Sequence, residues 1–249
     1  MHQFSARLFR GRPQRIRVKF LRPMLLSLLL LMGCTVGATR GMPFKLEVAT
    51  SYEGQLPCAS CPGVLWQLDM WPDGRFHLRQ EYLDRNAVNG RIGQWRYEAA
   101  QQRLVLLASG HDRVFLSVVG ADELRLLDRT GESIESELNY GLRRQAVFDT
   151  SEFAISLRGE FRYFADAASF TDCASGFRYP VIMGENFLEL ERGYLAQKLG
   201  AGKPWTIRID AQILNEQAME GEGPPQSVLI EGFSADVEKA CSYREKAAP

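Results

Sequence analysis

Turn-forming residues recur about every eight to twelve positions from Leu65 onward, and this spacing sets the strongest limit on the fold of the chain. Short alternating or apolar runs lie between the turns, which fall at residues 72–74, 89–90, 109–112, 120–122 and 128–131. Such spacing is typical of an antiparallel meander. A curved sheet or small barrel is the natural way to bury one face of each strand, so we predict a mainly β protein.

Alternation is clearest along residues 75–82, where apolar or aromatic side chains at 76, 78 and 82 alternate with charged ones. The buried face of this strand is predicted to hold Phe76, Leu78 and Tyr82. His77 lies among charged neighbours on the other face, so we place it in solvent. Asp69 and Asp73 lie beside a turn and are interpreted as the solvated end of a hairpin.

The second half of the chain has a different order of elements. After a polar stretch at 146–153, strand-like runs occur at residues 155–163, 170–173, 177–181, 205–214 and 226–233. One helix is predicted between the third and fourth runs, with Asn186 as N-cap, Glu189 completing a capping box and Gly200 as the stop. Its apolar stripe is predicted to be Phe187, Leu190, Tyr194, Leu195 and Leu199. Three strands, a helix and two strands is the order of an OB-fold.

The N-terminal segment is typical of an exported protein. Residues 1–23 carry seven basic and no acidic side chains, and residues 24–32 form an almost unbroken apolar run. This run is too short to span a bilayer, so residues 1–33 are predicted to be a signal peptide. Its removal leaves 23 basic against 30 acidic residues, a net charge of −7, which argues against nucleic acid as a partner.

The last residues of this segment, Leu31 to Cys34, resemble the bacterial lipobox, in which the cysteine is acylated and becomes the mature N-terminus. The resemblance implies that Cys34 carries fatty acyl groups such as palmitate and that residues 34–43 are a lipidated tether. Several acyl chains on one residue anchor a protein stably to membrane lipid. Thr35 stands where inner-membrane lipoproteins carry Asp, which implies an outer-membrane, periplasm-facing location.

Export also limits the state of the other cysteines. Cys58, Cys61, Cys173 and Cys241 form an even set in a compartment that oxidises thiols. Three disulfide pairings are possible. We favour Cys58 with Cys61 and Cys173 with Cys241, because each of these pairs falls inside one predicted domain.

The Cys58-x-x-Cys61 motif has three competing interpretations. Thioredoxin-like catalysis needs a thiolate at a helix N-terminus, whereas Cys61 is followed by Pro-Gly and a predicted strand. A closed zinc site needs four ligands, and neither His77 nor His111 has ligand spacing. A structural disulfide is favoured, and the reduced pair stays a candidate copper(I) site because two soft thiolates can hold that ion. Ser60 lacks a recognisable catalytic partner, as does Ser175, so no enzyme is predicted.

Several short motifs occur in fixed order along the chain. They lie at residues 54–63, 73–74, 81–83, 93–95, 126–128, 134–140, 157–159, 163–167, 170–173 and 190–195. Together they closely resemble the NlpE family of outer-membrane lipoproteins, which is linked to copper homeostasis and surface adhesion. The resemblance implies a lipocalin-like antiparallel half-barrel over 44–145, a linker over 146–153 and an OB-fold over 154–245.

The same resemblance implies a non-enzymatic activator of the Cpx envelope-stress system. The expected partners are the inner-membrane sensor histidine kinase of that system, the lipoprotein sorting machinery and membrane lipid. The resemblance also implies that the Cys173–Cys241 bridge reports failed oxidation in the periplasm. The alternative is a periplasmic module without a signalling role, which carries copper at Cys58 and Cys61 or a small apolar ligand in the first domain. No obligatory cofactor is expected.

Overall fold

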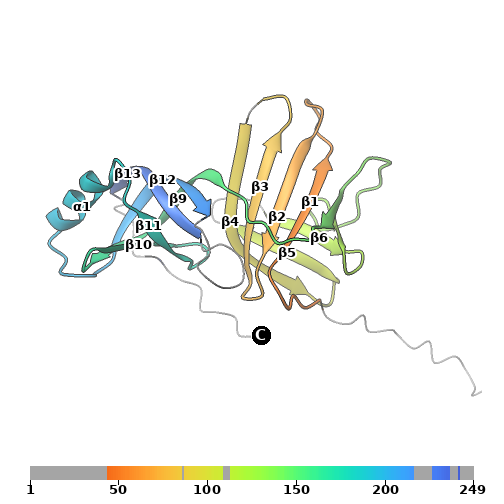
Figure 1. The fold of residues 1–249 in the computed structure, drawn as a ribbon. Coiled ribbons are helices and arrows are strands. Elements are labelled where there is room, and N and C mark those ends of the chain that lie inside the picture. The colour runs from red at the N-terminus through yellow and green to blue at the C-terminus, as the bar shows by residue number, and fades with distance from the viewer. Residues whose placement is uncertain (1–43, 86, 109–112, 216–225, 236–240, 242–249) are drawn as a thin grey trace, which may run out of the picture. The chain divides into compact units, whose positions relative to one another are not determined.

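The computed structural model describes residues 44–85, 87–108, 113–215, 226–235 and 241 (Figure 1). The strands form two closed barrels, and both belong to one compact unit, Met42–Pro249. The predicted signal peptide, Cys34 and His111 lie outside the described residues. Among the helices that are described, none is long and apolar enough to cross a membrane.

The first barrel contains eight strands that pair antiparallel in chain order, so the predicted meander is confirmed. The strands are β1 (Thr50–Leu56), β2 (Val64–Met70), β3 (Arg75–Tyr82), β4 (Ala87–Glu98), β5 (Arg103–Ala108), β6 (Val114–Val118), β7 (Glu123–Leu126) and β8 (Gly141–Arg144). Pairing of β1 with β8 closes the sheet. At this seam a Cβ on Gly54 would lie 2.2 Å from the carbonyl oxygen of Gly141, so only glycine allows the two strands to approach this closely.

Every second residue of β2 and β3 points into the first barrel. Leu68, Met70, Phe76 and Leu78 are at most 1% exposed and belong to one apolar cluster. The alternation in the sequence therefore identified the inner face of these strands correctly. Burial of this face is the main stabilising contribution of the barrel.

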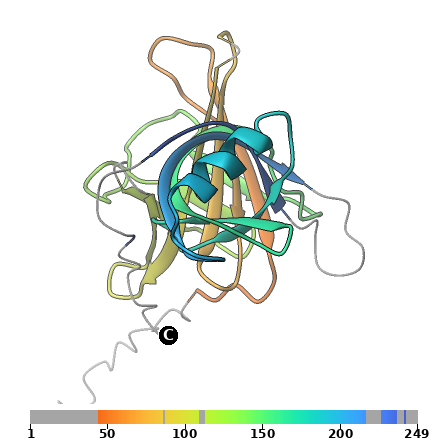
Figure 2. The same cartoon turned by 90° about the vertical axis from the view of Figure 1, so that its left-hand side faces the viewer.

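The second barrel has the strand order β10-β11-β13-β12-β9, and the chain order of its elements confirms the predicted OB-fold. Its elements are β9 (Phe153–Phe164), β10 (Ala167–Asp172), β11 (Arg178–Ile182), α1 (Phe187–Ala196), β12 (Trp205–Asn215) and β13 (Gln226–Ala235). The long strand β9 pairs with both β10 and β12, and the parallel pairing of β11 with β13 closes the barrel. Figure 2 shows α1 across one end of this barrel.

The helix differs from its prediction in detail. Asn186 occupies the N-cap position, but its side chain makes no capping hydrogen bond and instead donates to the carbonyl oxygen of Glu231 at 2.6 Å. The predicted capping box is therefore wrong. The helix buries only Leu190 and Tyr194, whereas Leu195 is 59% exposed. Only the first part of the predicted apolar stripe faces the barrel.

Candidate functional site

The first disulfide joins Cys58 and Cys61 in the loop between β1 and β2, with their Cα atoms 5.3 Å apart. Both side chains are half-buried against the apolar cluster of the first barrel. Arg85 fixes the loop from outside, because its Nη2 donates to the carbonyl oxygen of Ser60 at 2.8 Å and to the Ser60 hydroxyl at 2.9 Å. The bridge thus closes a short, well-anchored loop that follows directly on a strand.

A metal at this loop would have to use the two sulfur atoms of Cys58 and Cys61. Both are engaged in the disulfide, so binding requires reduction to two thiolates. Over the described part of the chain, no group of three or more His, Cys, Asp or Glu side chains could hold a metal ion. The loop therefore fits a two-thiolate site for a soft ion after reduction, and it does not fit a closed four-ligand zinc site.

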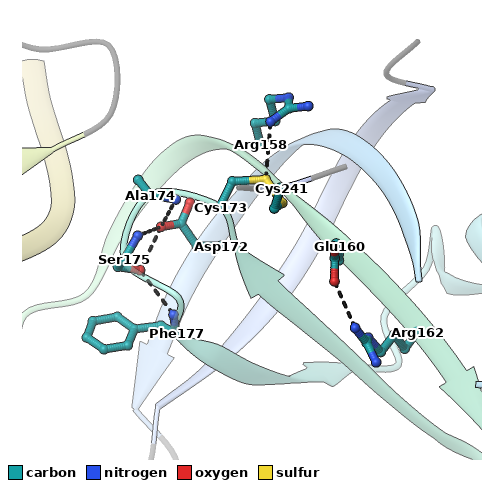
Figure 3. Close-up of a disulfide and its surroundings, with 9 residues drawn as sticks. All are labelled: Arg158, Glu160, Arg162, Asp172, Cys173, Ala174, Ser175, Phe177 and Cys241. Carbon is teal, nitrogen blue, oxygen red and sulfur yellow. Dashed lines mark hydrogen bonds and ion pairs between the residues drawn. A yellow bond between two sulfur atoms is a disulfide. The ribbon is translucent and has the colours of Figure 1, made fainter. Parts of the chain in front are cut away.

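The second disulfide joins Cys173 to Cys241, 68 positions further along the chain. Cys173 follows β10 directly and continues its pairing with β9, because its backbone N–H donates to the carbonyl oxygen of Arg158 at 2.9 Å. The Nη1 atom of Arg158 also lies 3.3 Å from the sulfur of Cys173 (Figure 3). These are the two pairings that the sequence favoured, and each barrel carries one of them.

A buried carboxylate organises the turn after Cys173. Asp172 is 2% exposed and accepts hydrogen bonds from the backbone N–H of Ala174 (3.1 Å), from that of Ser175 (2.7 Å) and from the Ser175 hydroxyl (2.6 Å) (Figure 3). Burial raises the pKa of Asp172, and the hydrogen bonds from Ser175 oppose that shift. The Ser175 hydroxyl is thus part of a structural turn.

The interpretation of Asp69 as a solvated residue is wrong. This side chain is fully buried and accepts hydrogen bonds from the backbone N–H of Ser151 (2.9 Å), the Ser151 hydroxyl (2.5 Å) and the Ser51 hydroxyl (2.7 Å). Burial raises the pKa of Asp69, while the hydrogen bonds from Ser151 and Ser51 lower it. Asp69 therefore ties the segment before β9 to β2.

The placement of His77 in solvent is also wrong. His77 is 1% exposed, and its Nε2 lies 3.0 Å from the hydroxyl oxygen of Tyr179 on β11. The rings of Trp71 and Phe153 pack edge-on against the imidazole. Desolvation, with a smaller contribution from the charge of Arg75, lowers the pKa of His77 to about 3. The imidazole is therefore neutral at neutral pH and acts as a packing residue.

The contact of Arg158 with the second disulfide was not predicted from the sequence. Arg158 precedes Gly159, and Gly159 pairs with Asp172 across β9 and β10, so this register brings Arg158 opposite Cys173. The sequence predicts two adjacent strands here, but it does not give their register to within one residue. No spacing motif in the sequence marks the contact.

Two small barrels, each with its own disulfide, define a class of two-domain β protein suited to an oxidising compartment. The family model described as the NlpE N-terminal domain matches residues 52–137, and that of the NlpE C-terminal OB domain matches residues 152–242. The chain is 34% identical over 217 residues to Lipoprotein NlpE of Escherichia coli (strain K12). This alignment spans 82% of the chain and 87% of that protein. The chain belongs to the NlpE family.

A solved relative is the crystal structure of the Cpx pathway activator NlpE from Escherichia coli. It shares 32% sequence identity with the chain, and the match covers 78% of the chain and 98% of the solved protein. The TM-score is 0.33. NlpE is not known as an enzyme family.

Proposed function

We propose that this chain is an envelope lipoprotein, acylated at Cys34, that activates the Cpx envelope-stress system without catalysing a reaction. The observation that carries the proposal is the sequence match of both domains to NlpE, over 87% of the length of the Escherichia coli lipoprotein. The solved protein of the family is a Cpx pathway activator. Its activity is transferred to this chain here by sequence similarity.

The proposed mechanism is positional. When the sorting machinery delivers the lipoprotein to the outer membrane, the first barrel is kept away from the inner-membrane sensor histidine kinase. When acylation or delivery of Cys34 fails, the protein stays at the inner membrane and its first barrel reaches the kinase. Two or more acyl chains are needed for an anchor that holds the protein in one membrane, which explains why location can serve as the signal.

Retention of the protein at the inner membrane tests this mechanism directly. We expect Thr35→Asp, which places an inner-membrane retention residue after Cys34, to shift the protein to the inner-membrane fraction and to raise a Cpx-dependent reporter. Thr35→Ser is the matched control and should leave both location and reporter at the wild-type level. A retained protein with an unchanged reporter would contradict the positional mechanism.

We further propose that the second disulfide makes the protein sensitive to failed oxidation. The bridge ties Cys241, beyond the last strand, to the end of β10, so its absence removes the covalent link between these two positions of the second domain. Cys173→Ser with Cys241→Ser should raise the Cpx reporter in cells with normal sorting. The matched double variant, Cys58→Ser with Cys61→Ser, should leave the reporter unchanged. An equal rise of the reporter in both double variants would argue against a specific sensor role of the second disulfide.

Copper binding in the first barrel is the second candidate function. The short loop holds the Cα atoms of Cys58 and Cys61 5.3 Å apart, so reduction would leave two thiolates close enough to share one soft ion. We expect native mass spectrometry of the reduced protein with Cu(I) to show one bound ion that is lost in Cys58→Ser. Equal copper loading of this variant would exclude the site and, with it, the proposed link to copper homeostasis.

A further inference from the structure

The two sulfur atoms of the second disulfide have different surroundings. The Nη1 atom of Arg158 lies 3.3 Å from the sulfur of Cys173, and the N–H of Cys173 donates to the carbonyl oxygen of Arg158 at 2.9 Å (Figure 3). A guanidinium group is charged at every pH that a protein meets, and it is a donor only. It therefore stabilises negative charge on the Cys173 sulfur more than the neutral disulfide or thiol.

Arg158 is the charged side chain that contacts the Cys173 sulfur. Arg208, its Cα partner across β9 and β12, lies on the same face of the sheet, and so do the carboxylates of Asp210 and Glu160. The nearest described carboxylate in sequence, Asp172, is turned into the following turn, where it accepts hydrogen bonds from Ala174 and Ser175. Arg158 engages further groups besides the sulfur. A cationic neighbour of this kind lowers the pKa of a cysteine thiol.

Cys173 is also held in place independently of the disulfide. Residues 167–172 pair with 159–164 in β9, and the hydrogen bond between Cys173 and Arg158 extends this ladder by one step. The strands approach closely here, because a Cβ on Gly159 would lie 2.4 Å from the carbonyl oxygen of Thr171. The contact between Arg158 and Cys173 is therefore expected to persist at the moment when the bridge opens.

We propose that Arg158 makes Cys173 the leaving sulfur of this bridge, so that an attacking thiolate forms its mixed disulfide with Cys241. In this step the incoming sulfur bonds to the sulfur of Cys241 and the Cys173–Cys241 bond breaks. The electron pair of the broken bond stays on Cys173 as a thiolate beside Arg158. The reductant is a small thiol or a dithiol oxidoreductase, and no proton is transferred. This inference deepens the proposed redox role by naming the sulfur through which the bridge exchanges.

When the bridge forms by the reverse step, Cys173 is the attacking thiolate and Cys241 carries the oxidant. A disulfide oxidant bound to Cys241 is displaced when the Cys173 thiolate attacks the Cys241 sulfur, and the oxidant leaves as a thiolate. The rate of exchange rises as the pKa of the leaving thiol falls. If the leaving thiol responds as strongly as the attacking thiol, for which the Brønsted coefficient is about 0.4–0.5, a pKa difference of about one unit gives a rate ratio of about three.

The test is the position of the first mixed disulfide. The oxidised, full-length processed protein in detergent is exposed briefly to glutathione, quenched with acid and N-ethylmaleimide, and mapped by peptide mass spectrometry. We expect glutathione on Cys241 and the alkyl group on Cys173, in at least about threefold excess over the opposite arrangement. An equal distribution, or an excess of glutathione on Cys173, would overturn the proposal.

Variants separate the charge of Arg158 from simple accessibility of the two sulfurs. Arg158→Gln should reduce the preference for Cys241 by about threefold or more, and Arg158→Lys should retain most of it. Arg162→Gln is the matched control, because Arg162 lies on the same strand and pairs with Glu160 at 2.8 Å (Figure 3). If Arg158→Gln is folded by circular dichroism and keeps the wild-type preference, Arg158 does not determine the exchange. If Arg158→Gln does not fold, the test rests on the wild-type ratio and on Arg158→Lys, which must both favour glutathione on Cys241.

This experiment is independent of signalling. It uses purified protein and contains no kinase, so an unresponsive Cpx reporter would contradict the proposed function and leave the exchange result standing. Conversely, a wrong assignment of the leaving sulfur would leave the positional mechanism intact.

Discussion

Two buried ionisable residues respond to acid in opposite directions. Asp69 contacts the segment before β9, and His77 contacts the second barrel. The pKa of His77 is lowered on folding, so the unfolded chain binds more protons and stability is lost as pH falls from about 6.5 toward 3. The pKa of Asp69 is raised on folding, so its ionised form costs stability and this cost is relieved as pH falls through the folded pKa. The histidine therefore makes the fold sensitive to mild acid.

His77→Gln should weaken the pH dependence of stability. From the shift to about 3, His77 alone costs the wild-type protein about 2 kcal/mol between pH 7 and pH 5, at about 1.4 kcal/mol per pH unit below 6.5. Urea denaturation at the two pH values should show a loss smaller by about this amount in the variant, whatever its stability at pH 7. Equal losses in both proteins would mean that the pKa of His77 is the same in the folded and unfolded states.

Asp69→Ala should destabilise the protein by about 2–4 kcal/mol, because it leaves the buried N–H of Ser151 and two hydroxyls without their acceptor. Asp73→Ala is the matched control. The Asp73 side chain is 55% exposed and pairs with Arg75 at the surface, so its loss should cost about 1 kcal/mol at most. Similar losses of thermal stability in the two variants would show that the buried network contributes little.

The sequence-based placement of Asp69 and His77 in solvent was wrong for one physical reason. Alternation shows which face of a strand a side chain occupies, and it identified the inner face of β2 and β3 correctly. It does not show what covers the outer face. Here Ser151, 82 positions further along the chain, covers Asp69, and Tyr179, 102 positions further along, covers His77. Such long-range covering leaves no periodic signal in the sequence.

At the scale of elements, α1 illustrates how tertiary packing limits a sequence prediction. Leu190 and Leu195 both belong to the predicted apolar stripe, but Leu190 is 1% exposed and Leu195 is 59% exposed. The amphipathic pattern located the helix. How much of that pattern is buried depends on which side of the helix packs on the barrel, and Leu190 and Tyr194 lie on that side whereas Leu195 does not.

Leu190→Ala and Leu195→Ala form a matched pair that tests this difference. Leu190→Ala should cost about 2–4 kcal/mol, because it leaves a cavity in the core of the second barrel. Leu195→Ala should change stability by about 0.5 kcal/mol or less. Differential scanning calorimetry measures both, and a large loss in Leu195→Ala would indicate that this side chain is covered in solution.

The strands were predicted better than the contacts between elements, because each strand carries its own alternation and turn residues. The runs 155–163 and 205–214 fall within β9 (Phe153–Phe164) and β12 (Trp205–Asn215). The disulfide partners followed from domain organisation. The contact of Arg158 with Cys173 could not be predicted, since it depends on the register of two strands to within one residue.

The two disulfides should contribute unequally to stability. The chain-entropy model gives about 4 kcal/mol for the loop closed by Cys173 and Cys241, and about 2 kcal/mol for the loop closed by Cys58 and Cys61. Thermal denaturation of the two double serine variants should therefore show the larger loss for the long loop. A larger loss for Cys58→Ser with Cys61→Ser would mean that contacts of the short loop, such as those of Arg85, dominate over chain entropy.

At the scale of the whole molecule, the proposed roles of Cys34 and of the two disulfides depend on where the protein is located in the cell. Anchoring at Cys34 would place the two barrels in the envelope, where thiols are oxidised and where distance from an inner-membrane kinase can change with sorting. In a reducing compartment Cys58, Cys61, Cys173 and Cys241 would be free thiols, and neither bridge could report on oxidation.

The most direct measurement is therefore an intact mass spectrum of the membrane-extracted protein, alkylated without prior reduction. We predict a polypeptide that begins at an acylated Cys34, with no alkyl group on Cys58, Cys61, Cys173 or Cys241. An unprocessed chain in which Cys34 and the other four cysteines are all alkylated would contradict the account.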